Sequence, residues 1–253
     1  MRDRSHSFNL EAVVLRHADW GEADRVITLF TRQRGKVKAL AKGARRIRSR
    51  KAGHLEPFTR VKLQLARSRG MPIVTQAETL DAHLPLHDNL VKTATASTVV
   101  ELLDRFTYED ETENPAIFSL LVETLKRINV QEDPWIAVRY YEIHLLDGLG
   151  YRPQLTLCAG CGETILPENQ YFSLLHGGVL CPRCGGGLAG ARPISMEALK
   201  ILRHLQRSEF AAAQKAKAAA SVRAEVETVL QTYITYLLER ELNSPGFLKQ
   251  VKN

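Results

Sequence analysis

The four cysteines of this 253-residue chain stand in two closely spaced pairs. Each pair has two residues between its members, nineteen residues separate the pairs, and a glycine follows each pair. The cysteines are Cys158, Cys161, Cys181 and Cys184. Two residues between thiolates allow the backbone to curl around a tetrahedral ion, and glycine permits the turn. Four thiolate ligands fill a tetrahedral ion, so the spacing predicts one closed, structural Zn²⁺ site rather than a catalytic one.

Other uses of two Cys-x-x-Cys pairs remain open at this point. Disulfides would require an oxidising compartment, to which the sequence does not point. A thioredoxin-like redox centre would use a single pair in a βαβ setting. The stretch YFSLLHGGVL, residues 171–180, predicts a hairpin with its turn at His176-Gly177-Gly178, which would bring the two pairs together. His176 is an alternative ligand, although a single histidine in a turn more often faces solvent.

A basic stretch supplies the other candidate chemistry. Residues 32–51, RQRGKVKALAKGARRIRSRK, contain ten Lys or Arg, and no acidic residue lies between Asp24 and Glu56. Like charges at this density repel one another unless a polyanion neutralises them. The lysines of the predicted strand 35–42 all point away from the core, and residues 43–51 form a loop beside them. This pattern predicts a groove that follows a phosphate backbone.

Alternative explanations of the basic stretch, without nucleic acid, are a solvated run of charges or a basic arm that binds an acidic protein or an anionic lipid. Trp20, Phe30 and Phe58 are candidates for stacking on bases. We expect Phe30 and Phe58, at strand positions, to belong to the core instead. The basic residues include no recognition helix, so we expect binding without sequence specificity.

Groupings of catalytic residues are weak in this sequence. Glu22 and Asp24 are the close acid pair of the basic region and would be needed by a metal-dependent nuclease. We interpret them as turn residues, with Arg25 placed to neutralise one of them. The acidic segment 108–114 has the composition of a polar loop between helices, and the sequence has no phosphate-binding glycine loop, nucleophile elbow or Ser/His/Asp grouping. We therefore predict that the protein is not an enzyme.

The basic residues need a scaffold, and the first 80 residues predict one made of short strands. Five β-rich stretches are separated by Gly, Pro or charged turns, at residues 8–16, 24–31, 35–42, 58–67 and 72–80. Five short strands hide their edges economically by closing into a small barrel, either OB-like or SH3-like. Residues 1–80 hold 18 Lys or Arg against 7 Asp or Glu, whereas the whole chain has 35 against 28. The basicity therefore belongs to this first domain, which we predict to bind nucleic acid.

Residues 81–253 predict a helical domain. Apolar residues recur at helical spacing from residue 89 to residue 150, and Asn114-Pro115 and Ser195 are of the types that begin helices. The cysteine segment, residues 155–188, is predicted as an insertion in this domain. The predicted fold class is thus α+β and multidomain: a small N-terminal β-barrel followed by an all-α domain that carries a four-cysteine zinc-binding loop.

The sequence has no run of about 18 apolar residues that would span a membrane, and no apolar segment near its N-terminus typical of a signal peptide. We therefore expect a cytoplasmic, nucleoid-associated protein with no membrane partner. Thiols stay reduced in the cytosol, which favours metal binding by the Cys-x-x-Cys pairs.

Several stretches together resemble the RecO family of DNA recombination and repair proteins. They are GEADRVITLFTRQRGKVKALAKGARR, LEPFTRVKLQLARSRG and TQAE in the basic part, and LLDGLGYRPQLTLCAGCG with GGVLCPRC around the cysteines. The resemblance implies an N-terminal OB-fold, a helical C-terminal domain and a recombination mediator without catalytic chemistry. It also implies binding to single- and double-stranded DNA and annealing of complementary strands. The implied partners are RecR and the single-stranded-DNA-binding protein (SSB), and together they help load RecA onto coated gaps.

Carried over position by position, the resemblance places the basic stretch in a DNA-binding module. The DNA-binding residues predicted on this basis are Arg34, Lys36, Lys38, Lys42, Arg45, Arg46, Arg48, Arg50 and Lys51. Members of the family differ in the cysteines, so the resemblance implies that the Zn²⁺ is a scaffold for the helical domain. Two other classes of protein remain open: a zinc-containing RNA-binding or RNA-modifying protein, and a metal-dependent nuclease.

Overall fold

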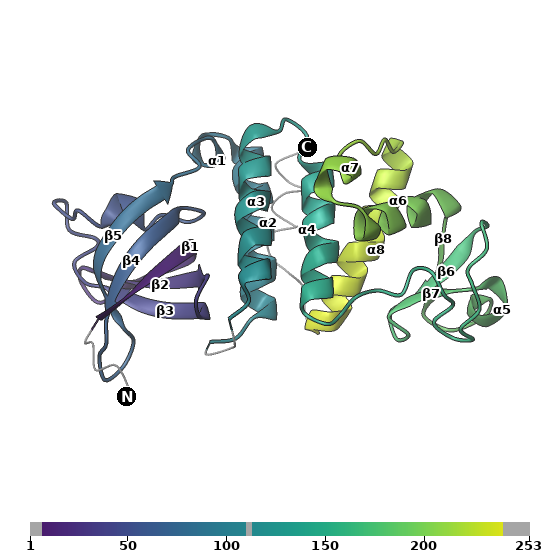
Figure 1. Cartoon of the computed structure of the whole chain (residues 1–253), viewed down its shortest axis with the longest axis horizontal. Helices are drawn as coiled ribbons and strands as arrows, with labels where there is room; N and C mark the ends of the chain where they lie inside the picture. The colour runs from purple at the N-terminus through teal and green to yellow at the C-terminus, as the bar shows by residue number, and fades with distance from the viewer. Residues whose placement is uncertain (1–6, 110–112, 240–253) are drawn as a thin grey trace. The chain divides into compact units, whose positions relative to one another are not determined.

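The computed structural model describes residues 7–109 and 113–239, and its contacts divide the chain into two compact units (Figure 1). Unit 1 includes the described residues up to Glu132, and unit 2 begins at Asp133. Within the described residues, unit 1 contains a five-stranded sheet and three α-helices, and unit 2 contains five α-helices and a three-stranded sheet.

The strands of unit 1 form a closed barrel (Figure 1). Their bounds are β1 Ser7–Trp20, β2 Asp24–Thr31, β3 Gly35–Ala41, β4 Arg60–Ala66 and β5 Ile73–Asp81. They neighbour one another in the order β1-β2-β3-β5-β4, and β4 closes the ring by pairing antiparallel with β1. The β3–β5 pair alone among these is parallel, and it meets at Leu40 and Ile73. The five predicted strands are confirmed, although β1 continues to Trp20.

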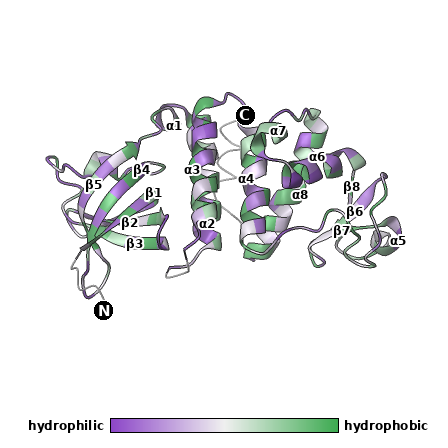
Figure 2. Cartoon of the chain, viewed as in Figure 1, coloured by the Kyte–Doolittle hydropathy of each residue, from purple (hydrophilic) through white to green (hydrophobic). Residues whose placement is uncertain are grey.

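The alternation of side chains along the strands explains why they curl around one core. Ala39 and Ala41 of β3 are buried in it, together with Val61, Leu63 and Leu65 of β4, as the alternating pattern predicts. Figure 2 shows the matching alternation of hydrophobic and hydrophilic positions along the barrel strands. Burial of one face of every strand fixes the register, because a shift by one residue would bring charged side chains into the core.

Three helices follow the barrel in unit 1: α1 Pro85–Asp88, α2 Leu90–Phe106 and α3 Pro115–Val130. A single 3₁₀ turn, Ala52–His54, lies between β3 and β4. Asn114 caps α3 as predicted, because its side chain accepts a hydrogen bond from the Ile117 backbone N–H. Unit 1 is thus larger than the domain predicted over residues 1–80, and we keep that domain boundary as a proposal.

Unit 2 is mainly helical, and the predicted cap at Ser195 is confirmed by the hydrogen bond that its Oγ accepts from Ala198 N. Its elements are α4 Trp135–Gly148, β6 Gln170–Ser173, β7 Gly178–Leu180, α5 Pro182–Gly185, β8 Ala191–Ile194, α6 Met196–Arg207, α7 Phe210–Ala213 and α8 Ala220–Leu238.

The small sheet of unit 2 corrects the all-α prediction. β6 pairs antiparallel with both β7 and β8, and β8 lies beyond the predicted insertion at 155–188. Pro193 of β8 has no N–H to donate, which an edge strand tolerates. In neither described stretch of the chain is any helix long and apolar enough to cross a membrane.

Candidate nucleic-acid interface and metal centre

The predicted DNA-binding residues have three different surroundings. Some are bound to groups contributed by other parts of unit 1, others lie exposed on the loop that follows β3, and Arg34 lies in the turn that precedes β3. The sequence predicted that they line one groove, whereas the structure separates the residues in β3 and the turn before it from those in the loop after it.

Lys36 links β3 to the end of α2. Its Nζ lies 2.5 Å from Asp104 Oδ1 and donates to the backbone oxygens of Asp104 at 2.6 Å and Thr107 at 3.1 Å. The Lys36 side chain is only 11% exposed. Backbone oxygens at the C-terminal end of a helix carry partial negative charge and attract an ammonium group. The expectation that Lys36 faces water is therefore wrong, because α2 covers this position of the strand.

Lys38 and Arg45 also have acidic partners. Lys38 Nζ lies 2.5 Å from Glu109 Oε1, and both side chains are exposed, at 36% and 43%. Arg45 Nε lies 3.3 Å from Asp19 Oδ2, and its Nη1 donates to the backbone oxygen of Gly21. The acidic residues absent from the basic stretch are thus supplied by distant parts of the chain.

The remaining cations form what we call the basic loop, residues 42–50. Its cations Lys42, Arg46, Arg48 and Arg50 are exposed, and none of them forms an ion pair with another described residue. Ile47 lies between two of these arginines and is fully exposed. This loop therefore carries the largest uncompensated positive charge among the predicted residues.

The basic loop is anchored at both ends. At its start, Asp24 Oδ1 accepts a hydrogen bond of 2.7 Å from Gly43 N, and Gly43 has a φ of +66°, which favours glycine. Arg45 N donates to the backbone oxygen of Ala23 at 2.9 Å. Just after the loop, Lys51 Nζ donates to the backbone oxygen of Val74 at 3.1 Å. Lys51 is thus used to hold the loop against β5.

The predicted neutralisation of Glu22 or Asp24 by Arg25 is wrong. Arg25 Nε lies 3.4 Å from Asp19 Oδ1, and its Nη1 donates to Glu56 Oε1 at 3.1 Å. Asp24 serves the turn at Gly43 instead. Across residues 7–109 and 113–239, the one group of His, Cys, Asp or Glu side chains that converges as metal ligands is the set of four cysteines.

The candidate stacking residues are buried or exposed as the sequence predicts. Phe30 and Phe58 are buried, whereas Trp20 is exposed. Trp20 ends β1 and pairs with Asp24, the residue that anchors the basic loop. An exposed aromatic ring therefore lies at the same end of the barrel as the unpaired cations.

A groove of about 750 Å³ runs from the turn before β3 along the first half of the strand. Its walls come from β1, the turn between β2 and β3, β3 itself, the segment between β4 and β5, and the residues after α2. Arg34 and Arg67 line it, and Arg34 Cζ lies 4.2 Å from the centre of the Phe8 ring. Sequence reasoning missed Phe8 and Arg67; the signal for Arg67 was its place in the basic turn ARSRG.

The four cysteines converge in unit 2. Their Sγ atoms all lie within 4.8 Å of one another. The β6–β7 hairpin, with Tyr171 opposite Leu180, brings the second pair to the first, as predicted. His176 is exposed, and its Nδ1 is hydrogen-bonded to Ser173 Oγ at 2.9 Å, so it does not belong to the cysteine cluster.

The electrostatics of the cluster fit a cation. Burial opposes ionisation of Cys158, but backbone N–H groups of Cys181, Cys161 and Gly160 favour its thiolate and lower its pKa to about 6. Hydrogen bonds with the side chains of Cys181 and Cys161, together with burial and the charge on Cys158, raise the pKa of Cys184 to about 12. Without a metal ion, Cys158 therefore loses its proton readily, whereas Cys184 resists ionisation beside it. A bound metal ion would stabilise both thiolates.

Glycines allow the close packing around the cysteines. Gly162 has a φ of +78°, in the region that favours glycine. A Cβ at Gly185 would overlap the Tyr171 side chain, and one at Gly178 would overlap the backbone of Gln154. The glycines are therefore required for the approach of α5 to β6 and of β7 to the first cysteine segment.

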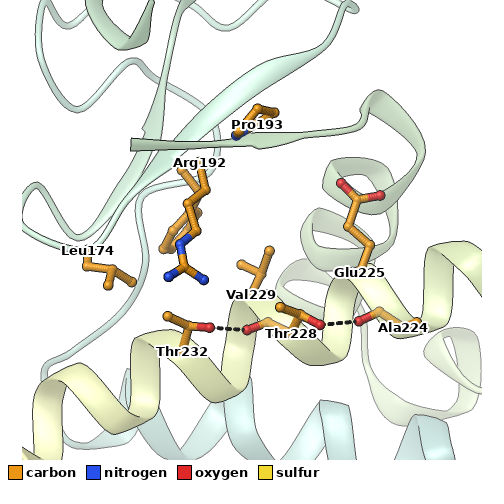
Figure 3. Close-up of a pocket in the computed structure, with 9 residues that line it drawn as sticks. Leu174, Arg192, Pro193, Ala224, Glu225, Thr228, Val229 and Thr232 are labelled. Atoms are coloured by element: carbon orange, nitrogen blue, oxygen red, sulfur yellow. Dashed lines mark hydrogen bonds between the residues drawn. The ribbon is translucent and has the colours of Figure 1, made fainter. Parts of the chain in front are cut away.

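Unit 2 also contains a hollow of about 300 Å³ between β8 and α8 (Figure 3). The hydroxyls of Thr228 and Thr232 donate to backbone oxygens one turn earlier in α8. Glu225 accepts hydrogen bonds from Ser195. Arg192 extends from β8 toward the α8 threonines in Figure 3. The walls of the hollow are thus mainly apolar, and its polar groups, the Arg192 guanidinium, the Glu225 carboxylate and two threonine hydroxyls, do not form a grouping of acid, base and nucleophile.

The structure thus defines a class of protein: a basic barrel with uncompensated cations, in the same chain as a helical unit with a four-cysteine centre. The chain matches the family descriptions "Recombination protein O N terminal" over residues 4–83 and "Recombination protein O C terminal" over residues 87–245. It belongs to the recombination protein O (RecO) family. Membership assigns it to DNA repair and recombination.

Curated relatives agree over almost the full chain. The DNA repair protein RecO of Roseiflexus sp. (strain RS-1) is 41% identical over 252 residues, which cover 100% of this chain and 88% of the relative. The DNA repair protein RecO of Dehalococcoides mccartyi is 35% identical over 94% of this chain and 93% of its own length. That of Symbiobacterium thermophilum is 32% identical over 97% of this chain and 98% of its own length.

Proposed function

We propose that this protein is a recombination mediator that binds single- and double-stranded DNA without sequence specificity and anneals complementary strands. With RecR it helps load RecA onto single-stranded DNA coated by SSB, and it works in the cytoplasm at the nucleoid without catalytic chemistry of its own. In this proposal the barrel of unit 1 is the family's OB-fold. The observation that carries the proposal is the basic loop, with four exposed cations that have no acidic partner among the described residues.

The basic loop suits annealing because the barrier to annealing is electrostatic. Two phosphate chains repel each other, and a protein that neutralises phosphates also gains free energy by releasing condensed counterions. Contacts to phosphates carry no sequence information, so a loop of arginines binds any strand. Trp20, exposed at the same end of the barrel, can stack on a base of any identity.

Among the residues predicted to bind DNA, the proposal separates contact from support. Lys42, Arg46, Arg48 and Arg50 contact phosphates, and Arg45 contributes from a partly exposed position beside Asp19. Lys36 and Lys51 shape the surface through their protein partners. Arg34 and Lys38 belong to the separate groove beside the first half of β3.

The metal in this proposal is one structural Zn²⁺, held by Cys158, Cys161, Cys181 and Cys184. The four Sγ atoms are close enough to share an ion, and thiolates are the ligands that zinc favours. When bound, the ion supplies a cross-link between the loop before β6 and the hairpin. It leaves no open position for a reacting water.

The test is the annealing rate of two complementary oligonucleotides coated with SSB, measured with the wild type and with a variant of the basic loop, Arg46→Ala/Arg48→Ala/Arg50→Ala. We expect the wild type to accelerate annealing, with an effect that falls as salt rises. Removing three phosphate contacts should flatten the slope of log affinity against log salt by about 2 on single strands. The matched control, Lys200→Ala/Lys215→Ala/Lys217→Ala, removes three exposed lysines of unit 2 and should leave the slope unchanged.

Each alternative gives a different result in the same assay. An affinity and slope equal to the wild type in the loop variant would refute the assignment of the loop. Preferential binding of RNA strands would favour the RNA-binding class. Strand cleavage on addition of Mg²⁺ or Mn²⁺ would favour a nuclease. RecR and SSB are tested by adding each to the wild type and measuring loading of RecA onto the coated strand.

A further inference from the structure

The groove begins at the end of β3 that is farther from the basic loop and is lined by residues other than those of the loop. Gly35, at the start of β3, pairs with Thr31, whereas Ala41, at its end, pairs with Arg25. The basic loop begins directly after Ala41, and the groove is lined by the turn directly before Gly35. Residues 36–38 of β3 also line the groove, and the basic loop begins at Lys42, so about 13 Å of strand separates the two, at about 3.3 Å per residue.

Arg34 is presented to the groove by a rigid turn. Thr31 Oγ1 donates to Gly35 O at 2.9 Å and accepts from Arg34 N at 3.0 Å, and Thr31 itself is buried. The Arg34 guanidinium lies over the Phe8 ring at 4.2 Å. This cation–π contact reduces the freedom of the side chain while its charge stays exposed, so little ordering is needed when an anion binds.

The facing wall of the groove contributes a second cation. Arg67 and Ser68 line it from the segment between β4 and β5. That segment is closed by Ser68 Oγ, which donates to Met71 O at 2.7 Å and accepts from Gly70 N at 3.2 Å. Arg67 is exposed and forms no ion pair with another described residue. Two guanidiniums thus face one groove from two hydrogen-bonded turns.

The third cation of the groove, on β3, can be released from its acidic partner. Lys38 is paired with Glu109, but both side chains are open to solvent, and such a pair contributes only about 0 to 1 kcal/mol. A phosphate in the groove can therefore compete with Glu109 for Lys38. Glu113 is a further acid of the groove wall, so the groove is positive on the barrel side and negative where Glu109 and Glu113 line it.

We propose that this groove is a second binding site for a nucleic-acid strand, separate from the basic loop, with Arg34, Arg67 and Lys38 on its phosphates and Phe8 holding the Arg34 guanidinium in place. The inference rests on the proposed function. It assigns two strand-binding sites to one barrel, so that one chain holds both partners of an annealing reaction. Glu109 acts as an internal competitor that weakens this second site.

The test counts the strands bound by each chain. A short oligodeoxythymidylate of about 8 nucleotides, within the site size of one OB-fold, is titrated at protein concentrations above the dissociation constant. We expect two oligonucleotides per chain for the wild type and one for Arg34→Ala/Arg67→Ala. The loop variant Arg46→Ala/Arg48→Ala/Arg50→Ala should also bind one. Annealing should fall in both variants, and the control Lys200→Ala/Lys215→Ala should behave as the wild type.

A substitution that is expected to tighten binding makes the test independent of folding defects, because a misfolded protein would bind more weakly. Glu109→Gln frees Lys38, so we expect binding at the groove to become tighter by about twofold to fivefold. The matched control is Glu123→Gln, which breaks a similarly exposed Lys–Glu pair on α3, outside the groove, and should leave the affinity unchanged.

The failures of the two proposals are distinguishable. One strand per wild-type chain, or two strands still bound by Arg34→Ala/Arg67→Ala, would overturn the second site while leaving the basic loop as the DNA-binding surface. An unchanged affinity in Glu109→Gln would overturn the role of Lys38. A wild type that binds no strand at all would overturn the proposed function, and the second site with it.

Discussion

Replacement of Lys36 by methionine separates support of the fold from contact with DNA. Lys36 neutralises Asp104, which is 16% exposed, and it also satisfies two backbone oxygens at the end of α2. Removal of one partner from a buried ion pair costs about 3 to 5 kcal/mol. Asp104 keeps a second partner, Arg16 at 2.8 Å, and it is not fully buried. We therefore expect Lys36→Met to lower the free energy of unfolding by about 2 kcal/mol.

The effect of Lys36→Met should depend on pH in a definite direction. Burial opposes ionisation of Asp104, but hydrogen bonds from Lys36 and Arg16 outweigh it, so the pKa of this carboxyl is lowered. A lowered pKa in the folded state stabilises the protein above the unfolded value of about 3.9, and this stabilisation is lost as pH falls through the folded pKa. The cost of Lys36→Met should therefore be largest near neutral pH and shrink below about pH 4.

The assay is denaturant unfolding at pH 7 and at acidic pH, combined with hydrogen exchange of peptides from β3 and α2. Faster exchange in both elements would show that the link between them has been cut. Lys62→Met is the matched control, because Lys62 is an exposed lysine of β4. If Lys36→Met unfolds like Lys62→Met but loses as much DNA affinity as Arg48→Ala, Lys36 contacts phosphate and the structural assignment is refuted.

Two further predictions concern unit 2. Cys158→Ser should reduce bound zinc and lower the melting temperature, because the Cys158 thiolate is the one that backbone N–H groups stabilise. The control His176→Ala should keep its zinc. A full zinc content in Cys158→Ser would contradict the assignment. Burial raises the pKa of Glu142 to about 7 despite the nearby Arg139. The Glu142 carboxyl therefore stays protonated to a higher pH in the folded than in the unfolded state. The free energy of unfolding should fall as pH rises from about 4.5 to about 7. Glu142→Gln should flatten this dependence, whereas the exposed control Glu197→Gln should not; an identical slope in both variants would refute the role of Glu142.

Local patterns in the sequence were sufficient for the parts of the fold that depend on local chemistry. The alternation in β3 and β4 predicted which side chains fill the barrel, and the asparagine before Pro115 predicted the start of α3. The spacing of the cysteines predicted that they converge. These features depend on residues that are neighbours along the chain or on a periodicity of two, and both are visible in the sequence alone.

The features that the sequence did not predict depend on partners that are distant along the chain. The basic stretch contains no acid, yet Lys36 and Lys38 meet Asp104 and Glu109, about seventy positions later. Alternation distinguishes the inside of a barrel from its outside, but it does not reveal whether a helix covers the outside. The groove was missed for the same reason, because Phe8, Arg34 and Arg67 come together only when the barrel closes.

The unequal exposure of the four cysteines sets how a bound metal would exchange. Cys158 is buried, Cys181 and Cys184 are partly buried, and Cys161 is exposed. An incoming chelator would reach the ion from the side of Cys161 and displace that thiolate first, while the buried ligand still held the ion. Release would then proceed by stepwise ligand substitution, at a rate that rises with chelator concentration, without prior unfolding of the helical unit.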